Sequence, residues 1–166
     1  MIIILKNNER LICDDFKFKC VVGKAGKTKN KVEGDKKTPK GTFTLGNLFY
    51  RSDRKKKPTT NLKCIKINKT MGWCDDVSSK KKYNKLIKID KRLKFRHEKL
   101  FRKDQVYDYL IPINYNSKNP ANGKGSAIFI HLTKNYKKTN GCVALKEKDF
   151  LILLKLINKK TKIKIF

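Results

Sequence analysis

Several residue types that would support other functions are scarce in this 166-residue chain. It has only two histidines, and its five cysteines include no Cys-x-x-Cys pair, so the paired spacing of a zinc site is missing. An odd cysteine number, in a chain long enough to bury a core, also argues against a disulfide framework. No apolar run reaches the roughly 18 residues of a membrane-spanning helix. We therefore expect no metal, no cofactor and no membrane span.

Acidic residues are also few: 14 against 43 lysines and arginines, which gives a formal net charge of +29. Such a charge favours a polyanionic partner, namely nucleic acid, anionic lipid or an acidic envelope polymer. Only six of the basic residues are arginines, the preferred readers of phosphates and guanines, so nucleic acid is the less favoured partner. The lysines cluster only at 54–57 (RKKK) and 80–82 (KKK). A compositional drift towards lysine, with solvated lysine faces, is therefore the competing interpretation.

The first residues, MIIILKNNERLIC, are not typical of a signal peptide. Their apolar stretch is too short for the central region of such a peptide, and no basic segment or small-residue cleavage site accompanies it. They predict a first strand instead. The protein then stays in the cytoplasm, is exported by a route that is not visible here, or has a leader outside these residues.

Short segments of alternating polarity predict a mostly β chain. The expected strands are 2–5 and 10–13, paired as a hairpin around an Asn-Asn turn, then 16–23, 38–45, 63–68, 106–114, 126–131 and 161–166. Residues 146–160 have the length of a helix, with Asp149 favouring its first turn. We expect long loops at 24–38 and 114–125, which usually indicate a functional site, whereas 85–104 gives no assignment. The chain 1–166 is therefore predicted to be one domain, with a single C-terminal helix and a last strand.

A cysteine follows Asn-Gly in TNGCVAL (139–145), and a histidine ends the apolar run GSAIFIH (125–131). At the end of a strand, His131 can be held by the sheet, and a short loop returns the chain to Cys142. Gly141 permits an unusual backbone angle and leaves room for a substrate. Nucleophilic acyl transfer needs a thiolate, a base and amide donors for the oxyanion. Spacing alone leaves a simpler alternative open, a turn with a buried cysteine and a hydrogen-bonded histidine.

The segment HLTKNYKKTNGCVAL (131–145) resembles the active site of the L,D-transpeptidase (YkuD-like) catalytic domain, in which a histidine and a variable loop precede Ser/Thr-x-Gly-Cys. The segment GDKKTPKGTF (34–43) is similar to a second hallmark of that family. GWCDD (72–76), YN (83–84) and RHEKLFRKD (96–104) resemble a smaller proteobacterial branch. The resemblance covers nearly the whole chain and implies a β-sandwich or barrel with a C-terminal helix and a final strand.

This resemblance implies roles for the matching residues. Cys142 would be the nucleophile, and His131 its general base or the imidazolium partner of its thiolate. The backbone carbonyl of Leu132 would orient the imidazole. Backbone N–H groups at Gly141 and Cys142 would form the oxyanion hole, and Thr139 would hold the loop.

Two positions depart from the family pattern. Many members have histidine where this chain has Asn140, a substrate-side position, so His131 is the only imidazole that the segment offers. Many also have arginine two residues after the cysteine, where this chain has Ala144. The second departure puts the donor specificity in doubt.

Five further residues are candidates for substrate binding. The pair Asp75-Asp76 could bind the ammonium group of a diaminopimelate side chain, or it could cap a turn. Trp73 could form a flat wall of the pocket, or it could belong to the core. His97 and Glu98 could form a second polar edge of the site, or the exposed start of a helix.

The reaction implied is acyl transfer on peptidoglycan stem peptides through a thioester, with an amine as acceptor in cross-linking or water in carboxypeptidase activity. A carbapenem would then acylate Cys142, and the protein would be a monomer of the periplasm or cell envelope with a role in cell-wall synthesis and cell shape. The alternatives are an L,D-carboxypeptidase or amidase on the same fold, or a basic protein that binds polyanions or nucleic acid.

Overall fold

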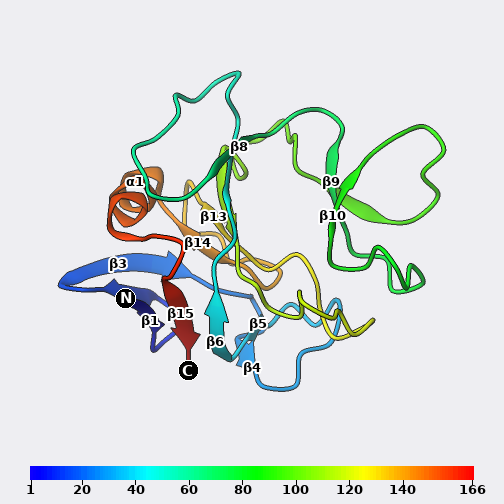
Figure 1. Ribbon diagram of the computed structural model, residues 1–166. Helices are drawn as coiled ribbons and strands as arrows, with labels where there is room; N and C mark the ends of the chain where they lie inside the picture. Colours follow the sequence, from blue (N-terminus) through cyan, green and yellow to red (C-terminus); the bar gives the residue numbers. More distant parts are fainter.

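The computed structural model describes residues 1–166, which form fifteen short strands and one helix (Figure 1). The strands are β1 (Ile2–Leu5), β2 (Arg10–Cys13), β3 (Phe16–Val21), β4 (Lys27–Thr28), β5 (Thr38–Pro39), β6 (Gly41–Thr44), β7 (Leu48–Tyr50), β8 (Cys64–Lys66), β9 (Met71–Cys74), β10 (Leu86–Lys88), β11 (His97–Lys99), β12 (Tyr109–Pro112), β13 (Phe129–Leu132), β14 (Val143–Leu145) and β15 (Lys162–Ile165). The helix is α1 (Glu147–Leu156). The prediction of a mostly β fold with a C-terminal helix and a last strand is confirmed.

Ten strands form one curved sheet in the order β6-β15-β1-β2-β3-β14-β13-β12-β7-β8. The last strand, β15, lies parallel to the first, β1, so both ends of the chain meet in the same part of the sheet (Figure 1). β14 runs parallel to β13 and antiparallel to β3. Parallel neighbours need a crossover connection, and residues 133–142 provide it here. This crossover carries the Thr-Asn-Gly-Cys segment.

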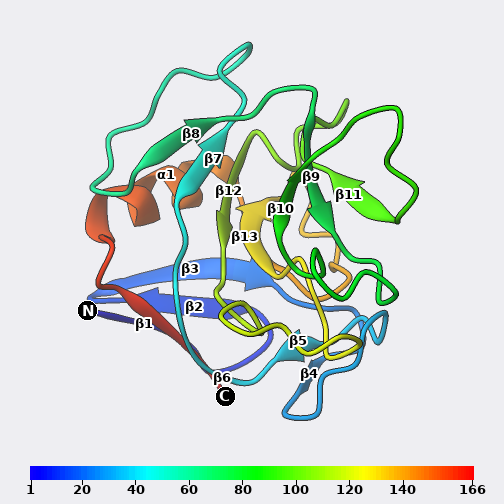
Figure 2. The ribbon, with the colours of Figure 1, turned by 45° about the vertical axis from the view of Figure 1, so that its right-hand side comes forward.

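Side chains of a strand point alternately to the two faces of its sheet, and here both faces are covered. One face carries the larger apolar core, against which Phe150, Leu153 and Leu154 of α1 pack. The other face carries a smaller core that includes Leu110, Phe129 and Cys142. A second sheet, of order β10-β9-β11, lies beside β12 and β13 and covers this smaller core (Figure 2).

The helix is shorter than the sequence predicts, because it ends at Leu156 and not at Lys160. Ile157 is extended and fully buried in the larger core, so the chain leaves the helical path there. The side chain and amide of Asn158 then bond to the turn that leads into β15. No helix in the structure has the length and apolar composition to cross a membrane.

Candidate active site

His131 lies in β13, and Cys142 directly precedes β14. The two parallel strands pair His131 with Ala144, so Cys142 lies two positions back beside Phe129. Residues two apart share a face, which places the sulfur and the imidazole as diagonal neighbours on the face of the smaller core. Their exposed fractions are only 8% for Cys142 and 7% for His131.

The imidazole of His131 is fixed by its own strand. Its Nδ1 lies 2.9 Å from the carbonyl oxygen of Leu132. A carbonyl only accepts hydrogen bonds, so Nδ1 carries the proton of the neutral ring and Nε2 is left to accept one. Burial lowers the pKa of His131 to about 4. At neutral pH the ring is therefore uncharged and has the protonation state of a general base.

The thiol of Cys142 is also neutral, and its hydrogen bonds go to the backbone. Its Sγ donates to the carbonyl of Ala127 at 3.3 Å and accepts from the Phe129 N–H at 3.3 Å, and it forms no hydrogen bond with His131. Burial, together with the nearby charge of Glu98, raises the pKa of Cys142 to about 12. The resting pair is therefore a thiol beside a neutral imidazole.

The loop before Cys142 is shaped by Thr139 and Gly141. The Thr139 hydroxyl donates to the Cys142 carbonyl at 2.6 Å and accepts from the Gly141 N–H at 3.1 Å. Gly141 has a φ of +141°, and a Cβ there would lie 3.0 Å from the Lys37 carbonyl oxygen. Glycine is needed both for the angle and for this close approach. In this structure the Gly141 N–H therefore points to Thr139, whereas the Cys142 N–H has no hydrogen-bond acceptor.

The segment 34–43 lies against this loop, so the two stretches that resembled one family meet in space. The Lys37 carbonyl faces Gly141, and Gly23, which bridges to Thr139, donates its N–H to the Thr38 hydroxyl at 2.9 Å. Asp35 fixes the neighbouring turn, because its carboxylate accepts from the Lys31 ammonium at 2.5 Å and from the Lys37 N–H at 2.8 Å. Asp35 therefore supports the wall of the nucleophile loop.

These strands and loops match a known family. The match is to "YkuD: L,D-transpeptidase catalytic domain", over residues 1–165. The chain belongs to this family. Among solved structures, it is similar to the crystal structure of the helical cell shape determining protein Pgp2 from Campylobacter jejuni, with a TM-score of 0.52 and 19% identity. The match covers 99% of this chain and 46% of the Pgp2 chain, so the chain spans less than half of Pgp2 and the likeness shows the fold. A comparison with curated proteins gives no match.

Trp73 of β9 packs against the smaller core beside the strand that carries His131. Its ring meets Phe129 edge-on, with 5.2 Å between centroids. Its Nε1 donates to the Oδ1 of Asn84 at 2.9 Å, and the same oxygen accepts from the Ala127 N–H at 3.1 Å. Asn84 also donates to the carbonyls of residues 115 and 116. Asn84 therefore connects the small sheet to the segment whose carbonyl holds the Cys142 thiol.

Glu98 of β11 lies directly opposite Trp73, so both side chains are on the same face of the small sheet. Its carboxylate accepts a hydrogen bond of 2.5 Å from the Tyr107 hydroxyl. The Tyr107 ring lies 5.4 Å from the His131 ring, and the Arg102 guanidinium lies 5.0 Å from the Tyr107 centroid. Glu98, Tyr107 and Arg102 thus line one side of the dyad. No local sequence pattern assigns a role to Arg102, although it lies within the segment 96–104 that resembles the proteobacterial branch.

His97 is separated from Glu98 by strand alternation. It pairs with Cys74 in the small sheet, and its Nδ1 lies 3.0 Å from the Phe95 carbonyl oxygen. A Cβ on Gly72 would come within 3.2 Å of the His97 ring, which places His97 on the Gly72 and Cys74 face, away from Trp73. The alternative prediction, an exposed helix start at 97–98, is wrong because these residues form a strand.

The two aspartates occupy turn positions. Asp75 lies 3.2 Å from the Arg96 Nε, in an exposed ion pair. The Asp76 carboxylate accepts from the hydroxyl and N–H of Ser78 and from the Arg96 N–H, and these bonds lower its pKa. Asp76 therefore organises the turn that follows β9, as the capping interpretation predicts. Asn140 is exposed and makes no hydrogen bond through its side chain.

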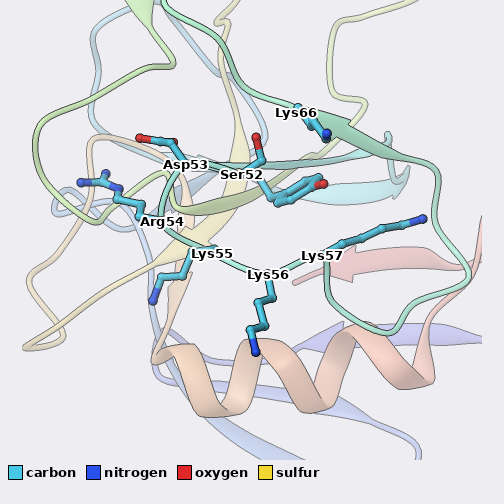
Figure 3. A pocket seen from close by; sticks show the side chains of 8 residues that line it. Ser52, Asp53, Arg54, Lys55, Lys56, Lys57 and Lys66 are labelled. Atoms are coloured by element: carbon cyan, nitrogen blue, oxygen red, sulfur yellow. The ribbon is translucent and has the colours of Figure 1, made fainter.

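A separate basic hollow of about 430 Å³ lies over the loop after β7 (Figure 3). It is lined by Tyr50, Ser52, Asp53, Arg54, Lys55, Lys56, Lys57 and Lys66. Two of its cations are already paired, Arg54 with Asp108 at 2.6 Å and Lys55 with Glu147 at 2.6 Å. Lys56, Lys57 and Lys66 point away from one another (Figure 3). The RKKK cluster is thus no converging anion site, and no group of three His, Cys, Asp or Glu side chains could hold a metal.

Proposed function

We propose that this YkuD-family chain is a cysteine acyltransferase of peptidoglycan, an L,D-transpeptidase with residues 1–166 as one catalytic domain. One observation carries the proposal. A neutral imidazole with its Nδ1 on the Leu132 carbonyl shares a sheet face with a buried cysteine on the neighbouring strand. In this arrangement the carbonyl of Leu132 sets the tautomer, and Nε2 of His131 is the base for Cys142.

In the first half-reaction, the Cys142 sulfur attacks the carbonyl carbon of the L-centre at the third position of a stem peptide. Its proton passes to Nε2 of His131 as the new C–S bond forms. The amides of Cys142 and Gly141 donate to the oxyanion, which requires the Gly141 N–H to exchange the Thr139 hydroxyl for the substrate. The intermediate then collapses, the C–N bond breaks, and the imidazolium returns the proton to the leaving nitrogen of D-alanine.

In the second half-reaction, the side-chain amine of a second stem attacks the thioester. His131 takes a proton from this amine, a new amide bond forms as the C–S bond of the thioester breaks, and the departing sulfur of Cys142 receives the proton from the imidazolium. If water attacks instead, the product is a shortened stem, which is carboxypeptidase activity. Trp73 and Glu98 flank the dyad and contact the stem, and Asp75 and Asn140 line its approaches. Asp76 organises the turn after β9, and His97 lies on the other face of the small sheet. The substrate places this chemistry in the cell envelope, with the chain acting as a monomer.

The test is incubation of the purified protein with muropeptides that carry tetrapeptide stems, followed by mass analysis. We expect loss of terminal D-alanine together with a cross-linked dimer. Cys142→Ala lowers turnover by roughly 10³-fold or more, whereas Cys64→Ala, which removes a cysteine from another part of the fold, keeps it. Turnover that survives Cys142→Ala would rule out the proposal. A carbapenem should add its mass to the native chain and not to the Cys142→Ala variant.

A further inference from the structure

The strand that carries the nucleophile brings no charge to the pocket. Ala144 lies beside His131 on β14 and is fully buried. Yet the residue that leaves in the proposed reaction is an α-amino acid with a free carboxylate. One extended residue spans about 3.5 Å, so this carboxylate lies about that far from the carbonyl carbon that Cys142 attacks. A cation near the dyad is therefore needed to recognise it.

Two cations lie near the dyad. Lys31 belongs to the turn that supports the nucleophile loop, and Arg102 lies over the Tyr107 ring that contacts His131. Lys31 is not free. Its ammonium donates to Asp35 at 2.5 Å and to the Val32 carbonyl at 3.0 Å, and its side chain is only 3% exposed. Its charge is thus committed to the turn that supports the nucleophile loop.

One nitrogen of the Arg102 guanidinium, Nη1, forms no hydrogen bond. Its Nε and Nη2 bond to Asp104 at 2.8 and 2.5 Å, which fixes the plane of the guanidinium. Nη1 lies 3.7 Å from the Glu98 carboxylate, beyond hydrogen-bond distance, and the side chain is 35% exposed. The guanidinium lies over Tyr107, whose ring contacts His131. Nη1 is thus an open donor at the edge of the dyad.

The loop that carries Arg102 is held from outside the site. The Arg51 guanidinium donates to the Arg102 carbonyl and stacks on Phe101, with 3.5 Å to the ring centroid. Arg54 donates to the carbonyls of residues 102 to 104. The position of Arg102 is therefore set before any substrate binds, and preorganised donors lose little entropy on binding.

The neighbouring acidic group, Glu98, has a hydrogen-bond partner of its own. The Glu98 carboxylate, which lies 3.7 Å from Nη1, already accepts the Tyr107 hydroxyl, and this bond fixes its orientation. A guanidinium presents paired N–H groups that fit a carboxylate better than an ammonium does. We propose that Arg102 binds the carboxylate of the amino acid that leaves the donor peptide, and so selects donors that end in a free acid. This inference rests on the acyl transfer proposed above.

The experiment compares two donors, the tetrapeptide stem with a terminal D-alanine and the same stem with a terminal D-alanine amide. For the native chain we expect kcat/KM to favour the acid by roughly 10- to 100-fold, as befits a charge-assisted hydrogen bond. In Arg102→Ala this preference should shrink to less than about threefold, because only the acid loses a partner. Arg102→Lys should keep an intermediate preference, and Arg92→Ala, which removes an exposed arginine, should keep all of it.

Each outcome bears on one idea. If Arg102→Ala lowers turnover of both donors equally, the acid preference survives and Arg102 is only structural, which overturns the inference. Should Arg102→Ala not fold, the preference in Arg102→Lys decides in the same way. If native turnover requires Cys142 but shows no acid preference, the inference fails and the proposed function stands. If Cys142→Ala still turns over both donors, the proposed function itself fails.

Discussion

The resting state of Cys142 can be tested directly by alkylation of the substrate-free protein over a range of pH. A cysteine nucleophile can rest as a thiolate paired with imidazolium or as a neutral thiol beside neutral imidazole. The first alternative reacts rapidly at neutral pH, whereas the second gains a base only during the reaction. Here the thiol donates to Ala127 and His131 is uncharged, so we expect the second.

The size of the expected effect on the alkylation rate follows from the burial of the Cys142 sulfur. The pKa of Cys142 is raised from 9.0 to about 12, chiefly because the sulfur is enclosed by the smaller core. At pH 8 a thiol with a pKa of 9 is about 10% thiolate, whereas one near 12 is about 0.01% thiolate. The thiolate population should therefore be lowered by about 10³-fold. The alkylation rate should rise about tenfold per pH unit, with no plateau up to pH 10.

The assay is iodoacetamide labelling from pH 6 to 10, with Cys142 followed by peptide mass analysis. A synthetic peptide of residues 139–145 is the control, because it holds the same cysteine without the fold. Its rate should bend near the ordinary thiol value. Steric shielding alone would lower the rate of the folded protein but leave that bend in place, so the shape of the profile separates the two effects.

A plateau below about pH 7 in the folded protein would refute the reasoning, because it would mean a thiolate stabilised by imidazolium. The variant His131→Asn sharpens the test. A neutral imidazole contributes no charge, so this variant should leave the alkylation profile of the free protein unchanged while abolishing turnover. A slower alkylation at neutral pH in His131→Asn would point to an ion pair.

Three further predictions concern the surroundings of the dyad. Burial lowers the pKa of His131 to about 4, whereas an unfolded histidine titrates near 6.5, so the unfolded chain gains its proton first on acidification. Stability should fall between pH 6.5 and 4 by up to about 3 kcal/mol more in the native chain than in His131→Gln, by urea unfolding. Gly141→Ala should lower the free energy of unfolding by about 2 kcal/mol and remove most turnover. The substitution places a Cβ 3.0 Å from the Lys37 oxygen at a φ of +141°. Gly123→Ala, with positive φ but open space, should keep turnover. Asn84→Ala removes four hydrogen bonds and should cost about 3 kcal/mol in urea unfolding, with the Trp fluorescence of β9 altered.

The sequence predicted the parts of the fold in which local chemistry repeats. FKFKCV and KIKI alternate with period two and form β3 and β15, and the short apolar run IIIL forms β1. β10 and β11 have three residues each, too few for a period to show, so 85–104 gave no assignment. Their pairing with β9 depends on contacts with the smaller core, which no local pattern encodes.

The two candidate residues of the dyad, His131 and Cys142, could be singled out because each lies in a stretch with its own local signal. His131 ends an apolar strand, and Cys142 follows a glycine that the turn requires. Arg102 and Tyr107 have no such signal, since they reach the site only through the small sheet and the loop held by Arg51. His97 illustrates the opposite error, because adjacency in sequence put it with Glu98 and strand alternation put it on the other face.

The enclosure of Cys142 and His131 between the two sheets explains their protonation states. It excludes water from the dyad, which raises the pKa of the Cys142 thiol and lowers that of the His131 imidazole, so both rest uncharged. The same low dielectric constant strengthens the interactions of neighbouring groups with the charges that develop when the proton moves from sulfur to nitrogen. A substrate carboxylate entering beside Arg102 would bring a negative charge towards the imidazole, which favours imidazolium. Substrate binding would then raise the basicity of His131 at the step that needs it, and the reactive thiolate would form only when a donor is in place.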